Sequence, residues 1–102
     1  MSCCVMLSLM INNFKCPETE MIFNGEQSRR LPANIQNVSR RKLRMLNNAV
    51  KLEDLRIPPA NRLEQLHGNR EGQHSIRINQ KWRVCFIWSD GNPENVEIVD
   101  YH

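Results

Sequence analysis

The chain ends in three residues that can hold or move protons, Asp100-Tyr101-His102. They follow an alternating apolar run, Val96-Glu97-Ile98-Val99, which predicts a strand that carries them into the body of the fold. Upstream, residues 72–83 predict a basic hairpin that could face this ending. Acid and base groups beside fixed arginines are what binding or cleaving a phosphodiester requires. A polar tail after a last strand is the simpler alternative, and the basic hairpin argues against it.

Two arginines of the hairpin are candidates to hold a phosphate. Arg77 and Arg83 come from neighbouring predicted strands and fall on the same face as Tyr101. Guanidinium groups bind phosphate oxygens in a fixed, often bidentate geometry. The alternative is that Glu97 pairs with one of them across the strands and neutralises it.

Two further polar side chains precede the hairpin. His67 stands directly before Gly68 and is a candidate for the site, although a lone histidine is more often structural or simply exposed. Glu64 fits either a base or an ordinary strand carboxylate. His74 lies among apolar neighbours and is expected at the edge of the core.

The middle of the chain is strongly basic. Between positions 29 and 51 there are seven basic residues and no acidic one, and from position 84 onward there are four acids and no lysine or arginine. Within the basic stretch, Arg40, Arg41 and Arg44 fall outside the apolar arc of a predicted helix. They could contact a polyanion or an acidic partner, and a solvated helix face is equally compatible with the charges.

Hydrophobic periodicity predicts an α+β fold. Residues 10–14 are expected to form a short strand, residues 17–23 a short helix, and residues 33–49 a longer amphipathic helix. Four strand-like runs joined by turns follow, and short links imply antiparallel neighbours. These runs cover residues 62–67, 73–79, 83–89 and 95–101.

Alternation along the predicted strands separates two faces of the sheet. One face should pack on the helices and takes His74, Ile76, Ile78, Trp82, Val84, Phe86, Trp88, Val96 and Ile98. The other face should be polar enough to be a working surface. It carries Gln73, Ser75, Arg77, Arg83, Cys85, Ile87, Glu97, Val99 and Tyr101.

At 102 residues the chain has room for one domain with a single core. The four cysteines, Cys3, Cys4, Cys16 and Cys85, match no zinc pattern and suggest no disulfide framework. We therefore expect a reducing cytoplasm, no metal and no cofactor. The apolar start is too short to span a membrane and lacks the basic region of a signal peptide. Residues 1–9 are expected to be an extension or a misassigned start before a domain that spans residues 10–102.

Several segments together resemble the HigB-type toxins of the RelE/ParE superfamily, the host-inhibition killer proteins of bacterial toxin–antitoxin pairs. The resemblance covers residues 10–102 and implies the RelE-like fold, with an N-terminal strand and two helices on one face of a mainly antiparallel sheet. Its segments are Ile11-Asn12-Asn13-Phe14, Arg41-Lys42-Leu43, residues 58–64, residues 72–79, Trp82-Arg83 and residues 96–102.

The resemblance implies a ribosome-dependent endoribonuclease that cuts mRNA during translation. The family's catalytic ending matches Asp100, Tyr101 and His102, and its strand arginine matches Arg83. Where many relatives carry a lysine before the glycine, this chain has His67, which would make the activity more sensitive to pH. The implied partners are the ribosome with its mRNA and a HigA-type helix-turn-helix antitoxin, which alone would contact operator DNA.

Cleavage of RNA without a metal would proceed by in-line attack of the 2′-OH on the adjacent phosphate. Arg83 would hold the phosphate with Arg77 or His67 in support, His102 and Asp100 would move or orient protons, and Tyr101 would position the RNA. Which group is base and which is acid stays open. Two rival functions share the fold, a ParE-like inhibitor of DNA gyrase without nuclease activity and a degenerate toxin that binds only its antitoxin and operator.

Overall fold

The computed structural model describes residues 11–100, and the site residues Tyr101 and His102 lie outside them. Two α-helices come first, α1 (Pro17–Phe23) and α2 (Ala33–Asn48). Four strands follow, β1 (Glu64–Gln65), β2 (His74–Arg77), β3 (Trp82–Ser89) and β4 (Asn92–Asp100). They form one sheet in the order β1-β2-β3-β4, and every neighbouring pair is antiparallel. This arrangement confirms the predicted α+β class.

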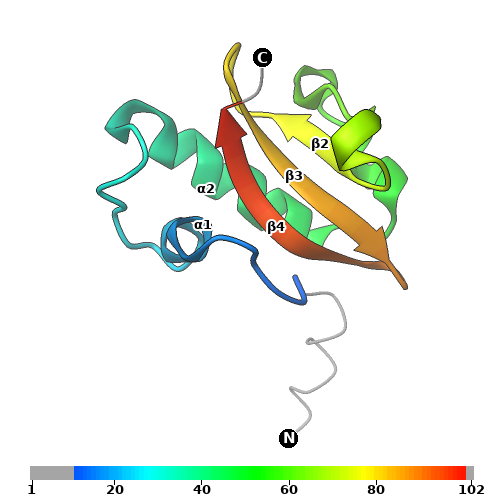
Figure 1. Cartoon of the computed structure of the whole chain (residues 1–102), viewed down its shortest axis with the longest axis horizontal. Coiled ribbons are helices and arrows are strands. Elements are labelled where there is room, and N and C mark those ends of the chain that lie inside the picture. Colours follow the sequence, from blue (N-terminus) through cyan, green and yellow to red (C-terminus); the bar gives the residue numbers. More distant parts are fainter. Residues whose placement is uncertain (1–10, 101–102) are drawn as a thin grey trace, which may run out of the picture.

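Both helices lie on one side of the sheet, as Figure 1 shows. The core between them is built from the apolar face of α2 and the inward residues of three strands. It includes Ile35, Leu43, Leu46, Ile76, Val84, Phe86, Val96 and Ile98. The predicted division of the sheet into two faces is therefore correct for the side that packs on the helices.

Short 3₁₀ turns connect the helical half to the sheet. They are η2 (Leu52–Arg56), η3 (Pro59–Asn61) and η4 (Gly68–Arg70). Asn61 in η3 is fully buried and donates from Nδ2 to the carbonyl of Leu55 in η2 at 3.1 Å. This bond holds the first two turns together beside α2.

The predicted first strand is not a regular strand in the part of it that is described. Phe14 makes an isolated parallel bridge with Val96 on the outer edge of β4. Hydrogen bonds from Asn12 N to Pro93 O at 2.9 Å and from Lys15 N to Val96 O at 2.9 Å flank it. Asn95, with φ of 54°, interrupts the extended backbone of β4 opposite this segment, so pairing stops after one bridge.

Two of the predicted strands have different bounds in the structure. The strand expected at residues 62–67 contains two residues, because Arg62 before it adopts φ of 47° and leaves the extended conformation. β4 begins earlier than expected, at Asn92, because Asp90 and Gly91 make the whole turn with φ of 53° and 82°. Positive φ at both central residues is the geometry that a two-residue hairpin prefers.

The face of the sheet turned away from the helices is more covered than the sequence suggested. Ser75 and Cys85 on this face are fully buried, and Arg83 retains 9% exposure. Arg70, at the end of η4, reaches across to Glu97 on β4 with Nη1 and Oε2 3.0 Å apart, and so covers the neighbouring strand. The face predicted to be a working surface is therefore buried over the middle of β3.

Candidate active site

Arg83 on β3 has three protein partners on the outer face of the sheet. Its Nε–H donates to the Ser75 hydroxyl at 2.7 Å, and its Nη2 donates to the Arg62 carbonyl at 2.7 Å. Oε1 of Glu64 lies 3.5 Å from the same Nη2. These partners fix the plane of the guanidinium, so its orientation is set before any ligand arrives.

Local backbone structure explains why these partners meet. β1 pairs with β2 so that Glu64 lies opposite Ser75, and β2 pairs with β3 so that Ser75 lies opposite Cys85. The left-handed conformation of Arg62, just before β1, turns its carbonyl toward Arg83. Two short-range features, a brief strand and one residue of positive φ, therefore position the arginine.

Arg77 and Arg83 lie directly opposite each other on β2 and β3, as the sequence predicted. Side chains of cross-strand partners project from the same face, and two like charges there favour an anion between or above them. The alternative in which Glu97 neutralises one of them is not what the structure shows. Glu97 pairs with Arg70 and, at 3.7 Å, with Lys15, whereas the carboxylate beside Arg83 belongs to Glu64.

Asp100 is the last described residue and the end of β4. It lies opposite Trp82, and Val99 lies opposite Arg83, so alternation places the Asp100 carboxylate on the other side of the strand from the Arg83 guanidinium. Its Oδ2 is 3.6 Å from the Lys81 ammonium. β4 therefore ends beside β3 at the level of Arg83, while the Asp100 carboxylate itself lies on the face that carries Trp82. The roles assigned to Tyr101 and His102 fall outside the described residues.

His67 lies at the start of η4 with its side chain exposed. The residue before it, Leu66, is buried and donates its N–H to the Gln73 carbonyl at 2.8 Å, which fixes this corner of the backbone. Glu64, the other polar residue of the segment, is the one that contacts Arg83. The structure therefore joins Glu64 to the site directly and leaves His67 on the surface.

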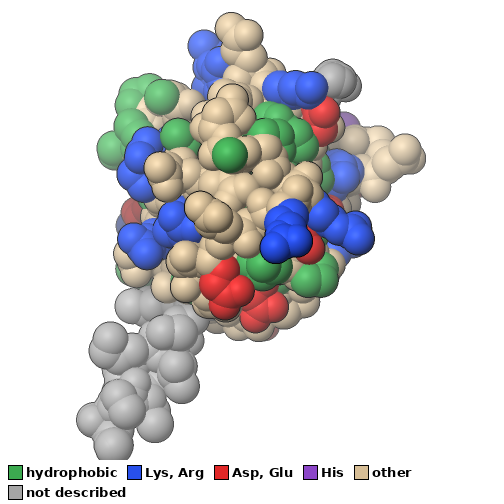
Figure 2. Space-filling view, turned by 90° about the vertical axis from the view of Figure 1, so that its left-hand side faces the viewer, with side chains coloured by type: hydrophobic (Ala, Val, Ile, Leu, Met, Phe, Trp, Pro, Cys, Tyr) green, Lys and Arg blue, Asp and Glu red, His purple; other side chains and the backbone are tan. Residues whose placement is uncertain are grey.

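The three arginines predicted to form a basic face of α2 are not equivalent. Arg40 donates from Nε to the Ile22 carbonyl at 2.8 Å and from Nη2 to the Glu26 carbonyl at 3.2 Å. It thereby satisfies one carbonyl in the last turn of α1 and one in the loop after it, and has a structural function. Arg41 and Arg44 are exposed. The end of the molecule seen in Figure 2 carries Lys and Arg in separate groups, with neutral surface between them.

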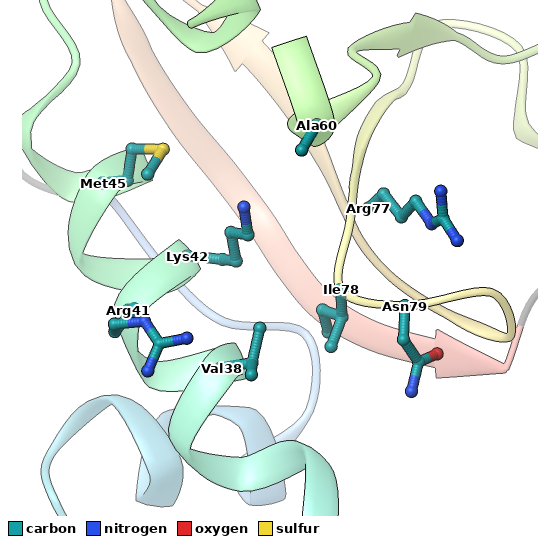
Figure 3. A pocket seen from close by; sticks show the side chains of 8 residues that line it. All are labelled: Val38, Arg41, Lys42, Met45, Ala60, Arg77, Ile78 and Asn79. Atoms are coloured by element: carbon teal, nitrogen blue, oxygen red, sulfur yellow. The ribbon is translucent and has the colours of Figure 1, made fainter. Parts of the chain in front are cut away.

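A cavity of about 300 Å³ lies beside α2, at the end of β2. Lys42 and Arg41 of α2 and Arg77 of β2 contribute to its lining (Figure 3). The Lys42 ammonium donates to Oδ1 of Asn61. Partial burial, and secondarily the charge of Arg41, lower the pKa of Lys42 from its ordinary value. Lys42 and Asn61 fall in segments that resemble the family, but their contact was not predicted, because it depends on how η3 packs on α2.

Comparison with known proteins identifies the family. Residues 12–102 match the model of the RelE-like toxins of the HigB type II toxin–antitoxin system. The chain belongs to this family. It is 43% identical over 83 residues to Toxin HigB-1 of Vibrio cholerae serotype O1, a match that covers 80% of this chain and 87% of the relative. It is also 27% identical over 93 residues to Endoribonuclease HigB of Proteus vulgaris, covering 91% of this chain and all of that protein.

A solved structure agrees with the fold of this HigB-family toxin. The YoeB-YefM complex from Staphylococcus aureus contains a chain that superposes with a TM-score of 0.56 at 16% identity, over 90% of this chain and 97% of the other. At that identity the likeness supports the RelE-like architecture alone. Membership of a type II toxin–antitoxin family makes a protein antitoxin its partner. The family match also includes positions 100–102, where the predicted catalytic ending lies.

Residues 11–100 offer little support for a metal site, a thiol nucleophile or a membrane-spanning helix. No group of three or more His, Cys, Asp or Glu side chains among them is placed to hold a metal ion. Burial raises the pKa of the Cys85 thiol to about 11, so that thiol stays protonated and is a poor nucleophile. None of the helices in this part of the chain has the length and apolar character needed to cross a membrane.

Proposed function

We propose that this toxin is a ribosome-dependent endoribonuclease that cuts mRNA during translation. The observation that carries the proposal is Arg83, a guanidinium held by Ser75, the Arg62 carbonyl and Glu64 next to the end of β4. The name of the Proteus relative, an endoribonuclease, supports the same activity. Support for the rival gyrase inhibitor is weaker, since neither the family description nor the name of that relative refers to gyrase.

The proposed reaction is attack of a ribose 2′-OH on the adjacent phosphorus, with departure of the 5′-oxygen of the next nucleotide. Arg83 stabilises negative charge on the phosphorane-like transition state, and Arg77 opposite it, or His67, adds a second cation. His102 moves the protons of the two oxygens, Asp100 at the end of β4 orients or assists it from the neighbouring face, and Tyr101 positions the RNA. Positioned acids and bases contribute about 10²–10⁴-fold to such reactions. No step requires a metal.

Dependence on the ribosome follows because few groups of the site would align the RNA backbone for attack. Arg83 is fixed by the protein, but in-line attack also requires the 2′-oxygen, the phosphorus and the leaving oxygen to be aligned. A ribosome that presents the mRNA in a distorted conformation would supply that alignment. Arg41 and Arg44, both exposed on α2, are suited to contact ribosomal RNA.

We further propose that the partner antitoxin is a HigA-type protein with a helix-turn-helix domain. Operator DNA would then be bound through the antitoxin, and the toxin would act on mRNA in the cytoplasm. The structural relative from Staphylococcus aureus is itself described as a complex, which is consistent with a toxin that is held by a protein partner.

Mapping of mRNA ends in cells after induction tests the proposed activity. The chain should produce cuts in translated frames, and Arg83→Ala should abolish them. Arg56→Ala, at an exposed arginine of η2, is the matched control and should cut normally. Thermal unfolding and antitoxin binding establish that each variant folds. Intact mRNA accompanied by DNA damage would refute the proposal in favour of gyrase inhibition.

A further inference from the structure

The cavity beside α2 combines positive charge with an apolar wall. Val38 and Met45 of α2 and Ile78, which follows β2, line it together with Arg41, Lys42 and Asn79. Its volume is about 300 Å³. Among residues 11–100, no acidic side chain lines this cavity. An occupant that matches this lining is an anion that also carries a flat or apolar part.

Lys42 lines the cavity, and a hydrogen bond to Asn61 holds its side chain in place. Its acceptor, Asn61, is fully buried, and Nδ2 of the same amide donates to the Leu55 carbonyl at 3.1 Å. The amide orientation is therefore fixed, and it fixes the ammonium in turn. An ammonium has three N–H donors, and Asn61 accepts from one of them. The remaining donors suit an anionic ligand.

Asn79 supplies a second fixed donor on the opposite side of the cavity. Its Oδ1 accepts from the backbone N–H groups of Lys81 and Trp82, both at 2.8 Å, which locks the side chain in the turn before β3. The side-chain NH₂ is then available to donate to a ligand. Lys42 and Asn79 come from segments 37 positions apart in sequence, so the cavity itself is a product of the fold.

Arg77 connects the cavity to the outer face of the sheet. Arg77 is one of the residues that line the cavity, and its guanidinium points away from α2, as Figure 3 shows. On the outer face Arg77 lies opposite Arg83. Arg77 thus lies between the two sites, since it contributes to the cavity lining and stands opposite Arg83.

We infer that this cavity binds one nucleotide of the RNA substrate, with the phosphate at Arg41 and Lys42 and the base against Val38, Met45 and Ile78. The inference rests on the proposed endoribonuclease function and adds a subsite to it. RNA fits better than an acidic peptide for two reasons. Each nucleotide brings an anion and an apolar ring face together, and a repeating backbone charge is needed to reach both the cavity and the Arg83–Arg77 pair.

Binding of a non-cleavable ligand tests the inference on the full-length protein. A 2′-O-methyl RNA trinucleotide, titrated while backbone amide signals are followed by NMR, should give saturable shifts at residues 38–45 and 78–79. Lys42→Gln keeps a donor for Asn61 and removes the charge, and it should weaken binding roughly five- to tenfold. The slope of log K against log salt should fall by about 0.7, as for loss of one phosphate contact with single-stranded RNA.

Arg56→Gln is the matched control, because Arg56 is an exposed arginine of η2 that carries the same charge and is absent from the cavity lining. It should leave the shifts at the cavity and the salt slope of the trinucleotide unchanged. The inference is overturned if the cavity amides do not shift, or if Arg56→Gln weakens binding as much as Lys42→Gln. Saturable binding of hexaglutamate at the cavity in place of the trinucleotide would overturn it in favour of an acidic protein partner.

The two proposals fail in different ways. Trinucleotide binding at the cavity without any cleavage of translated mRNA by the unaltered chain would refute the endoribonuclease and leave the cavity as an RNA site. Cleavage that depends on Arg83, without amide shifts at the cavity, would refute the subsite and leave the endoribonuclease.

Discussion

The outer face around Arg83 and the cavity beside α2 use positive charge in opposite ways. Arg83 is nearly buried and already binds a hydroxyl, a carbonyl and a carboxylate of the protein. Lys42 is partly buried and has a single amide oxygen as its hydrogen-bond acceptor among the described residues. The contacts of Arg83 fix the orientation of a cation, which determines its effect on the rate of a reaction. The single contact of Lys42 leaves ammonium N–H groups available to bind a ligand.

Arg40 shows that residue type alone does not separate these functions. It lies one position before Arg41 on the same helix, yet it donates to the Ile22 carbonyl in the last turn of α1 and to the Glu26 carbonyl in the loop that follows. An arginine whose N–H groups are bonded to the backbone in this way cannot be replaced by another basic residue without loss of packing. The comparison teaches that the partners of a basic residue, rather than its place in a basic run, indicate whether it is structural or functional.

Removal of the chain ending should have the largest effect on activity and a small one on folding. Deletion of residues 100–102 should abolish growth arrest, because it removes Asp100 and His102, the groups proposed to orient or move protons, together with Tyr101. β4 stays anchored upstream, where Ile98 N–H donates to the buried Thr19 hydroxyl at 3.0 Å. A cooperative thermal transition and antitoxin binding should therefore persist. Full toxicity of the truncated protein would remove the proposed catalytic ending.

Ser75→Ala should break the arrangement around Arg83. It leaves the buried Nε–H without its acceptor, which costs about 1–3 kcal/mol of unfolding free energy. Cleavage should fall as well, because the guanidinium loses one of its orienting bonds. Denaturant unfolding and cleavage of ribosome-bound mRNA measure the two effects.

Ser39→Ala is the control for Ser75→Ala, since Ser39 is also fully buried and its hydroxyl has no hydrogen-bond partner among residues 11–100. Its unfolding free energy should be unchanged or higher. Equal losses from both serine variants would mean that volume, not the bond to Arg83, determines the effect.

The position of His67 is expected to give a smaller effect. A lysine ammonium keeps its positive charge at mildly alkaline pH. We expect His67→Lys to preserve or raise cleavage there, and His67→Ala to lower it at every pH. Initial rates on ribosome complexes between pH 6 and 9 distinguish the two variants. If His67→Lys is as inactive as His67→Ala, the side chain acts through neutral imidazole or through packing.

His74 should produce the smallest effect, on stability alone. Burial next to Phe86 lowers the pKa of its imidazole below the value of 6.5. The unfolded chain then binds a proton more readily, so stability is complete above pH 6.5 and declines as the pH falls through and below it. Replacement by Gln should flatten this decline in denaturant unfolding curves recorded at pH 5 to 8. An unchanged slope would show that His74 does not titrate differently in the two states.

The sequence predicted most of what depends on periodicity. The bounds of α1 and α2, the antiparallel order of the strands and the pairing of Arg77 with Arg83 across β2 and β3 follow from spacing. The two-residue length of β1 does not follow from spacing. It results from the positive φ of Arg62, a conformation that few non-glycine residues adopt.

The contacts of the site were harder to predict, since they join segments distant in sequence. Glu64 was recognised as a possible base, but its pairing with Arg83 depends on the register of β1. The capping by Arg40 depends on where α1 ends relative to α2. Ser75 gives no signal in the sequence, because a buried serine looks like any other polar strand residue until its partner is known.

Cleavage of one mRNA by purified protein, with and without ribosomes, tests the central claim most directly. We expect the chain to cut ribosome-bound mRNA, to cut free mRNA poorly, and to lose the ribosome-bound reaction in Arg83→Ala while antitoxin binding is retained. Cleavage of free mRNA at the ribosome-bound rate, or undiminished cleavage by Arg83→Ala, would contradict the account.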